Sequence, residues 1–435
     1  MPQSFDAIII GAGIIGNAIA FELSKKGYKT LSVDSKGDSG HGSTSGSCAI
    51  IRVHYSTFEG TAFAYEGYFY WKNWNDYLQF VDERGLATFK ETGCLIMQTQ
   101  ANNYLEKHIK ICDELQIPYQ QWNREKIENK LPHYNLEQFY PPKLQEEKNF
   151  GLSNGKHLKS GIFFPTAGYV TDPALSAHNI QRAAENTGAT FLFNSTVAEI
   201  IQSNNRVEGI CLANGDKYTA SIVVNVAGPW SSKINQIANV TKDMMITTRP
   251  LKQEVVHINA PKSIDFENNG FVISDSDVGV YCRPEKGNNI LIGSEDPPCD
   301  AHQWVEDASD YDQNFTEQWR TLVLRYAQRV PELEISTKTR GVVDLYDTTE
   351  DWIPIYDCSS LKGYYMACGS SGNQYKNAPI AGKMMAKLIE YCEDNNNHDR
   401  NPCKFLLPYI NKTINVGFYS RRRKINKDSS FSVLG

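Results

Sequence analysis

The sequence predicts an α/β fold in which a discontinuous, parallel-sheet part is joined to a second part with a mainly antiparallel sheet. At about 150 residues per domain, the 435 residues allow two or three domains. An apolar run at residues 5–10 leads into glycines, and a helical pattern then precedes a second strand-like run at residues 28–33. This alternation is typical of parallel sheets. Shorter strand-like runs at residues 94–99, 254–258 and 289–293 fit the antiparallel sheet.

Residues 11–16 form the motif Gly-Ala-Gly-Ile-Ile-Gly between the first strand and the helix. Gly11 permits the tight turn, Gly13 lets the backbone approach a pyrophosphate, and Gly16 lets the helix pack close to the strand. The free amides at the helix N-terminus, at Ile14 and Ile15, then face the phosphate charge. The motif therefore predicts a Rossmann-like unit that binds a dinucleotide.

Asp34 supports the same interpretation from the end of the second strand. It lies eighteen residues after Gly16, where a carboxylate can bind the ribose hydroxyls. A carboxylate rather than an arginine at this place disfavours the 2′-phosphate of NADP. NAD and FAD both remain compatible with the motif.

Composition and charge exclude several classes of protein. The chain is 41% hydrophobic and 22% charged, with a net charge of -6, which argues against nucleic-acid binding. The stretches without a charge are too short to cross a bilayer, and the N-terminus shows no secretory pattern, so we expect a cytoplasmic protein with no membrane insertion. The ten cysteines are scattered, which favours reduced thiols and predicts no metal site.

Residues 42–52 form a run of small residues that ends in Ile50-Ile51-Arg52. Backbone amides and hydroxyls of such a run can lie against a flat cofactor. The apolar pair before Arg52 indicates that this side chain points inward, where a guanidinium needs a partner. A substrate carboxylate is a good bidentate partner, and an acidic side chain is the structural alternative.

At this point the sequence resembles a known family, the D-amino-acid-oxidase-like FAD-dependent oxidoreductases, in particular the sarcosine oxidase and dimethylglycine dehydrogenase branch. The resemblance extends over roughly residues 5–390. Beyond the opening unit, it rests on residues 42–52 with Tyr55, 195–200, 223–231, 349–355 and 369–376.

The resemblance implies FAD rather than NAD, and a Rossmann-like FAD-binding domain covered by a mainly antiparallel sheet domain. The FAD-binding domain would comprise residues 1–90, 160–240 and 340–400. The α+β substrate domain would comprise residues 91–159 and 241–339, and residues 401–435 would form a C-terminal tail.

The resemblance also implies the residues of the site. The cofactor would be bound by Gly11, Gly13, Ile14, Ile15, Gly16, Asp34, Ser43, Thr44, Gly46, Ser47, Val197, Ala227, Gly228, Trp230, Gly369, Gly372, Asn373 and Lys376. Arg52 and Lys376 would hold a substrate carboxylate so that a C–H bond points towards flavin N5. The expected reaction is dehydrogenation of the C–N bond of a small or N-methylated amino acid to an imine. Oxidation of a 2-hydroxy acid or a primary D-amino acid, and a non-catalytic flavoprotein, are the alternatives.

Two departures from the family pattern refine these expectations. Asp344 occupies the place of a flavin-linking cysteine, and Thr44-Ser45 replace the pair that contains a linking histidine, although His41 lies nearby. We therefore expect non-covalent FAD. Tyr281 replaces the lysine that activates oxygen in the simple oxidases, which favours a dehydrogenase using another, unidentified electron acceptor.

Other candidates have two interpretations each. Arg283 is either a substrate-facing cation or part of an inter-strand ion pair, and His54 is either a catalytic base or an ordinary hydrogen-bonded histidine. The aromatic-rich residues 55–80 favour a helix packed on the core, with an amine-binding cage as the alternative. Residues 421–424, Arg-Arg-Arg-Lys, are expected to form a solvated basic turn.

Overall fold

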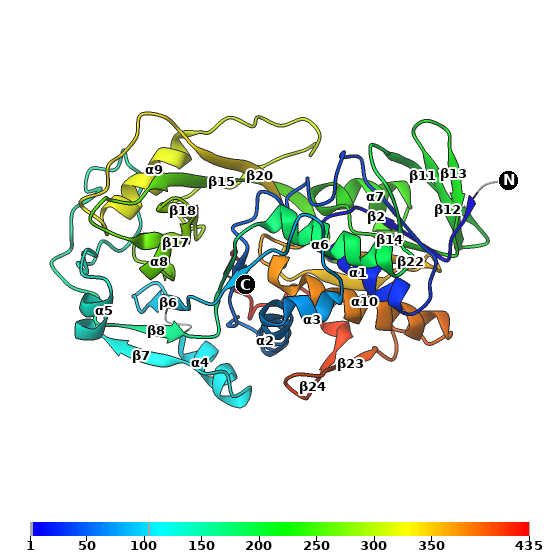
Figure 1. Cartoon of the computed structure of the whole chain (residues 1–435), viewed down its shortest axis with the longest axis horizontal. Helices are drawn as coiled ribbons and strands as arrows, with labels where there is room; N and C mark the ends of the chain where they lie inside the picture. The colour runs from blue at the N-terminus through cyan, green and yellow to red at the C-terminus, as the bar shows by residue number, and fades with distance from the viewer. Residues whose placement is uncertain (1–2, 103–104, 435) are drawn as a thin grey trace.

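Two large sheets form the two halves of the molecule, and the ribbon in Figure 1 shows them beside each other. The computed structural model describes residues 3–102 and 105–434. Within these residues, no helix combines the length and the apolar composition that crossing a bilayer requires. All ten cysteines are free thiols.

The first half contains a six-stranded sheet whose central strands are parallel. Its order is β10 (Thr190–Leu192), β3 (Thr30–Val33), β2 (Ala7–Ile10), β14 (Ile222–Asn225), β22 (Tyr364–Cys368) and β21 (Ile355–Cys358). Only β21 runs antiparallel to its neighbour. In β2, Ala7 and Ile9 join one buried cluster while Ile8 and Ile10 join another, because successive side chains point to opposite faces. The sheet is therefore covered on both faces, as the continuous apolar run predicts.

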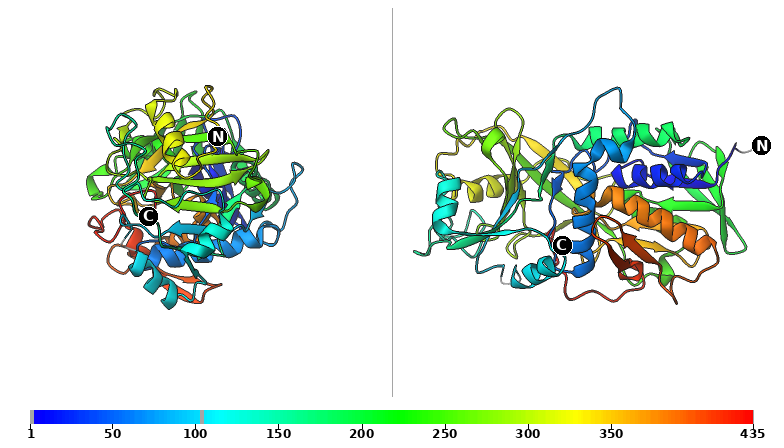
Figure 2. Two further views of the ribbon diagram at one scale, coloured as in Figure 1. Left: turned by 90° about the vertical axis from the view of Figure 1, so that its left-hand side faces the viewer. Right: turned by 60° about the horizontal axis from the view of Figure 1, so that its bottom comes forward.

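Three helices cover one face of this sheet: α1 (Ile14–Lys25), α6 (Pro173–Asn186) and α10 (Ala378–Glu393). They lie side by side in Figure 1 and in the right-hand view of Figure 2. Asp172 caps α6 by accepting the Leu175 N–H, and Pro173 occupies the first turn. A Cβ at Gly382 of α10 would lie 2.5 Å from the Ala18 carbonyl oxygen. Glycine at this place allows α10 to pack closely on α1.

The other face carries a four-stranded sheet of β11 (Val197–Ser203), β12 (Arg206–Leu212), β13 (Lys217–Thr219) and β1 (Gln3–Ser4). Next to it lie η1 (Gly228–Trp230), α7 (Ser231–Ile237) and η2 (Thr241–Asp243). In the chain, β1 and β11–β13 precede β14, whereas η1, α7 and η2 follow it.

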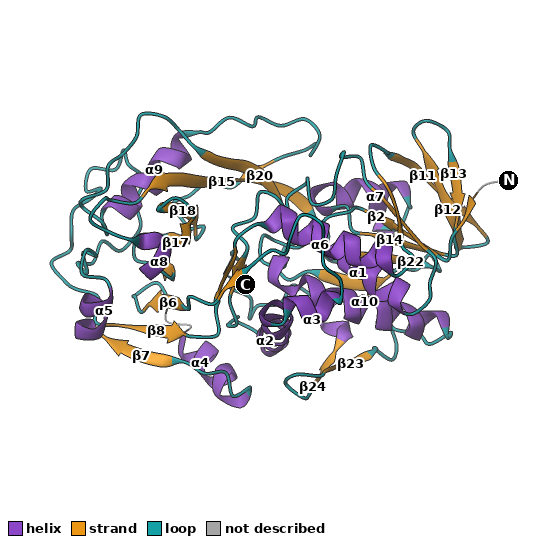
Figure 3. Ribbon diagram, viewed as in Figure 1, coloured by secondary structure: helices purple, strands orange, loops and turns teal. Residues whose placement is uncertain are grey.

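The second half is built on a nine-stranded sheet (Figure 3). Its order is β19 (Gln303–Trp304), β15 (Arg249–Asn259), β18 (Asn289–Ser294), β17 (Val280–Glu285), β16 (Val272–Asp275), β6 (Cys94–Met97), β8 (Ser160–Phe164) and β7 (Gln120–Asn123), with β20 (Gly341–Thr348) paired to β15. Only β6 and β16 pair in parallel. The expected fold class is confirmed, whereas the domain boundaries stay a prediction.

Short helices and an ion cluster complete this half. The helices are α4 (Leu105–Glu114), α5 (Arg124–Lys130), α8 (Phe266–Asn269) and α9 (Glu317–Ala327). After α9, Arg329 is fully buried and pairs with Asp275 at 2.7 Å and with Asp277 at 2.6 Å. Since a buried arginine needs carboxylate partners, these pairs hold the end of α9 against β16.

The aromatic-rich residues 55–80 form α2 (Phe58–Lys72) and α3 (Trp74–Leu78), which pack in the core. The Trp71 ring stacks between Trp74 at 4.4 Å and Tyr375 of η3 (Tyr375–Asn377) at 5.2 Å. No aromatic side chain of residues 55–80 lines the large cavity described below. The structure therefore agrees with the core interpretation. Before α2, β4 (Ile50–Ile51) pairs with β9 (Gly168–Val170), which also pairs with β5 (Phe89–Lys90).

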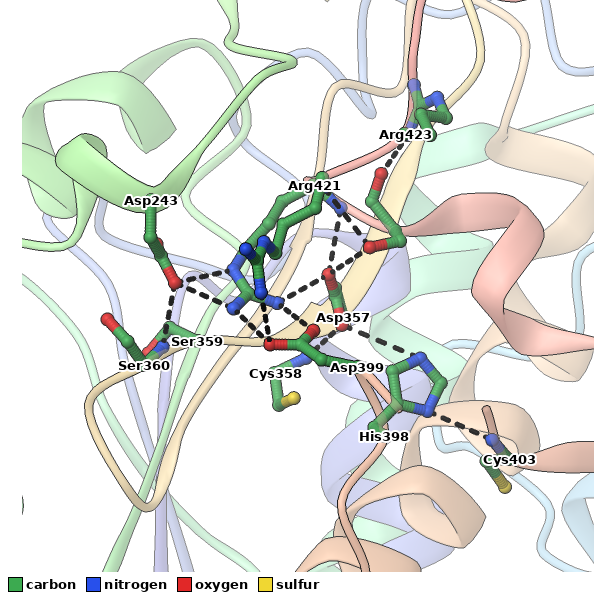
Figure 4. A network of polar contacts seen from close by, with 12 residues as sticks. Asp243, Asp357, Cys358, Ser359, Ser360, His398, Asp399, Cys403, Arg421 and Arg423 are labelled. Atoms are coloured by element: carbon green, nitrogen blue, oxygen red, sulfur yellow. Dashed lines mark hydrogen bonds and ion pairs between the residues drawn. The ribbon is translucent and has the colours of Figure 1, made fainter. Parts of the chain in front are cut away.

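Residues 401–434 form β23 (Lys404–Leu407), β24 (Lys412–Asn415) and η4 (Val416–Tyr419) before an irregular final stretch. The expected solvated basic turn is wrong for Arg421, whose side chain is 0% exposed. Arg421 pairs with Asp243, Asp357 and Asp399 (Figure 4). Three carboxylates from separate segments converge there, and they need a buried cation between them. Only Arg422 and Lys424 of this run are exposed.

Candidate active site

A cavity of about 680 Å³ lies between the two sheets, within the usual range for ligand sites. Its walls come from the turn after β2, residues 41–50, the β14–η1 connection, strands β15, β17 and β20, and residues 370–376. Every cofactor-binding residue predicted from the sequence lines this cavity except Gly369. Residues that are far apart in the chain are thus brought to one place.

The glycine motif needs glycine for steric reasons at its two ends. Gly11 has φ +115°, and a Cβ there would lie 2.4 Å from the Val226 carbonyl oxygen. A Cβ at Gly16 would lie 2.0 Å from the Gly11 carbonyl oxygen. The turn therefore brings the backbone against β14 and opens α1 towards the cavity, where the Ile14 N–H donates to the Thr44 hydroxyl at 3.1 Å.

Asp34 lies at the end of β3, where its carboxylate is oriented by two backbone groups. Oδ2 accepts the Ala12 N–H at 2.7 Å and Oδ1 accepts the Lys36 N–H at 2.8 Å. Val197, at the start of β11, lines the same end of the cavity. This end therefore offers a carboxylate beside a glycine turn, as a ribose site requires.

Arg52 and Lys376 lie together at the other end of the cavity, and both are buried. Lys376 Nζ donates to the Tyr55 hydroxyl at 2.5 Å and to the Asn373 carbonyl at 2.7 Å. The Arg52 guanidinium stacks on the same Tyr55 ring at 4.3 Å. Among the described residues, neither cation is ion-paired with a carboxylate.

The electrostatic consequence appears at Lys376. Burial, and then repulsion by Arg52, hold the pKa of the Lys376 ammonium well below its usual value of 10.5. Two buried positive charges without an anion are costly. The pair therefore has the character of an anion-binding site, and such perturbed groups cluster at functional sites.

His54 lies beside this pair, with its ring stacked on Phe164 at 4.7 Å. Its Nδ1 is shielded from solvent and makes no hydrogen bond to any residue that the structure describes. Burial lowers the pKa of His54 well below 6.5, and the charges of Arg52 and Lys376 lower it further. The imidazole is therefore neutral at physiological pH and a weak base.

Tyr281 and Arg283 have different surroundings on β17. Tyr281 lines the cavity, its hydroxyl lies 3.5 Å from Cys48 Sγ, and burial raises its pKa well above 10. Arg283 lies outside the lining, pairs with Glu285 at 2.9 Å and donates to the Cys48 carbonyl at 2.6 Å. Arg283 is therefore in an ion pair, but within β17 rather than between two strands as expected.

Gly369 does not line the cavity itself but binds Asp347, which does. Its N–H donates to Asp347 Oδ2 at 2.6 Å, and burial raises the pKa of Asp347 to about 7. Asp344 lines the cavity beside Gly46, where a Cβ would lie 2.4 Å from Asp344 Oδ2. Sequence reasoning missed Asp347, because no local motif surrounds it. Its position three residues after Asp344, which occupies the place of a linking cysteine, offered only a weak signal.

Val433 and Leu434 of the C-terminal tail also line the cavity, and neither was among the site residues predicted from the sequence. Arg52 Nη2 donates to the Val433 carbonyl oxygen at 2.6 Å. The two adjacent aliphatic residues after a polar stretch were the available signal. Such an aliphatic pair indicates that these side chains are buried, but not which part of the protein they contact.

Comparisons with known proteins agree with this geometry. The family model described as "DAO: FAD dependent oxidoreductase" matches residues 6–388. The chain is 27% identical to glycerol 3-phosphate dehydrogenase of Caloramator mitchellensis, over 92% of this chain and 78% of that protein. It is 25% identical to monomeric sarcosine oxidase of Bacillus sp. (strain B-0618), over 89% and 93% of the two chains. The structure of L-proline dehydrogenase from P. horikoshii superimposes with a TM-score of 0.75 at 21% identity, over 97% and 98%.

Proposed function

The chain belongs to the DAO family of FAD-dependent oxidoreductases, and we propose that it dehydrogenates the C–N bond of a carboxylate-bearing amine. The substrate would be an amino acid or an N-methylated amino acid, and the product an imine that water hydrolyses. When bound, FAD supplies the hydride acceptor.

The residues present fit this cofactor. The Gly11 turn leaves no room for a side chain, and the N-terminus of α1 borders the cavity beside it, as phosphate binding requires. We propose that Asp34 holds the ribose and that the small residues Ser43, Gly46 and Gly372 lie along the flavin. The carboxylate of Asp344 stands where a linking cysteine would be needed, which supports a non-covalent flavin.

The observation that carries the proposal is the buried pair of cations without an anionic partner. A substrate carboxylate between Arg52 and Lys376 would place one negative charge against both cations in a place with little water. The Tyr55 ring, which contacts both cations, holds them in position. Fixing the carboxylate in this way orients the adjacent C–H bond, and orientation is a contribution that the protein makes while the flavin supplies the hydride chemistry.

The amine needs no strong base in this site. Burial, and then the positive charges nearby, lower the pKa of His54 and keep it neutral, so it can accept a hydrogen bond but holds a proton weakly. Tyr281 stays protonated, and it offers a hydroxyl rather than a cation to the cavity. We propose that the amine binds unprotonated, and that the absence of a cation at Tyr281 favours an acceptor other than oxygen.

A second candidate is the oxidation of an alcohol on an anionic substrate, because one relative named above is a glycerol 3-phosphate dehydrogenase. The two candidates share the need for an anion at Arg52 and Lys376. They differ in the bond that is oxidised, so the substrate decides between them.

The test is anaerobic addition of sarcosine, proline, D-alanine, N-methylvaline and glycerol 3-phosphate to the purified yellow protein, followed at the flavin absorbance. Bleaching by an amine supports the proposal, and bleaching by glycerol 3-phosphate alone replaces it with the second candidate. A flavin that none of them reduces, although dithionite does, contradicts both. Admitting air to a bleached sample separates oxidase from dehydrogenase.

A further inference from the structure

Residues 429–434, here called the closing segment, end inside the cavity. The Val433 side chain is buried and packs with Leu251 and Trp352, and Tyr281 and Tyr346 lie against this cluster. The Val433 carbonyl oxygen accepts the hydrogen bond from Arg52. The closing segment thus uses the cation that the proposed function assigns to the substrate.

The other end of the Val433 residue faces a carboxylate. Its N–H lies close enough to Asp296 to lower the pKa of that carboxyl, although burial is the larger effect and raises this pKa to about 7. Asp296 Oδ1 accepts from Gln253 at 3.2 Å, whereas Oδ2 is shielded from solvent and makes no hydrogen bond of ordinary length to the described residues. A buried carboxylate oxygen in this state is an unused acceptor.

Val433 therefore presents the atoms of an α-amino acid in order. Its carbonyl oxygen, a stand-in for a carboxylate oxygen, meets a cation. Its N–H, a stand-in for an amine, lies near the Asp296 carboxyl, and its isopropyl group fills an apolar recess of Leu251, Tyr281, Tyr346 and Trp352. A peptide carbonyl carries only a partial charge, so it leaves the two cations largely uncompensated, and a true carboxylate is the better ligand.

We propose that the closing segment occupies the substrate position and withdraws when the substrate binds. The substrate is then an amino acid with an aliphatic side chain of valine or leucine size, and Asp296 binds its amine. This inference rests on the proposed function for the identity of the reacting molecule. It adds the class of the substrate's side chain, assigns Asp296 to the substrate's amine, and identifies the closing segment as a competitor for the substrate position.

The first measurement is binding of isovalerate, an unreactive aliphatic carboxylate, to the FAD-loaded protein, followed by calorimetry. Val433→Ser weakens the closing segment, so the binding-competent fraction rises and the Kd of isovalerate falls by about tenfold. The control is Phe431→Ser, in the same segment but 43% exposed, which leaves the Kd unchanged. An equal Kd in the wild type and the Val433→Ser variant overturns the proposal.

The second measurement uses the unchanged protein. Saturating isovalerate increases amide hydrogen exchange in residues 429–434 if the segment withdraws. Unchanged exchange there, with isovalerate bound, shows a fixed wall and overturns the proposal.

The third measurement concerns Asp296. Asp296→Asn weakens binding of N-methylvaline, which has an amine, by about tenfold or more, while binding of isovalerate stays the same. Equal losses for both ligands, or none, contradict the role of Asp296. Because all three measurements follow binding, a flavin that no amine reduces would refute the proposed reaction without affecting them.

Discussion

Replacing Lys376 by methionine separates a lysine that binds substrate from one that supports the fold. Lys376 Nζ donates to the Tyr55 hydroxyl and to the Asn373 carbonyl. In its absence these two groups stay paired, because the Tyr55 hydroxyl itself donates to the Asn373 carbonyl at 2.9 Å. The variant therefore leaves no buried polar group without a partner at this place.

The size of the effect follows from the charge that is lost. A hydrogen bond to a charged group contributes about 1.5–3 kcal/mol, and about 1.4 kcal/mol corresponds to a tenfold change. Lys376→Met therefore raises KM about 10- to 150-fold. The variant is not destabilised, because it lacks a fully buried charge that has no anionic partner. Its Tm is therefore equal to or above that of the wild type.

The assay is steady-state kinetics with the amine that bleaches the flavin, together with a thermal melt and the ratio of flavin to protein. Lys383→Met is the matched control, because Lys383 pairs with Glu22 outside the cavity, and its KM stays unchanged. An unchanged KM in Lys376→Met, or a clear fall in Tm with flavin lost, refutes the carboxylate role.

Three further outcomes are expected. The Kd of isovalerate rises as the pH passes through the lowered pKa of Lys376, because the ammonium that binds isovalerate loses its proton, and Lys376→Met lacks this rise. The unfolded chain keeps that proton up to pH 10.5. Between the lowered pKa and pH 10.5, the contribution of Lys376 to the free energy of unfolding therefore increases with pH. Gly11→Ala, whose Cβ would collide with β14, yields protein without flavin colour, while Gly27→Ala, with no atom within 4 Å, keeps it. Arg421→Met lowers the free energy of unfolding by about 3–5 kcal/mol, whereas Arg422→Met, an exposed partner of Asp399, changes it by about 1 kcal/mol or less, both measured by urea denaturation.

The sequence predicted most of what depends on short-range pattern. The glycine turn, Asp34 and the small-residue run are local signals, and the cavity collects them as expected. Arg52 was also predicted to point inward, because the apolar pair of β4 fixes its direction.

The remaining features depend on contacts between distant segments. The Arg52–Val433 hydrogen bond joins residues 381 positions apart, and Arg421 gathers carboxylates from three places in the chain. Nothing in the composition of residues 421–424 distinguishes a buried arginine from a solvated one. The local sequence indicates whether a side chain is apolar, polar or charged, whereas its contacts depend on how distant segments pack together.

The order of strands in the parallel sheet has a consequence for synthesis. Strand β2, made early from Ala7–Ile10, pairs with β14 at Ile222–Asn225, and β14 in turn pairs with β22 at Tyr364–Cys368. At about 5–20 residues per second, the ribosome delivers β22 roughly 20 to 70 seconds after β2. Throughout that interval an aliphatic strand has an unpaired edge, which is a template for association with other chains. The walls of the cavity are therefore completed only after residues 367–376 have been made.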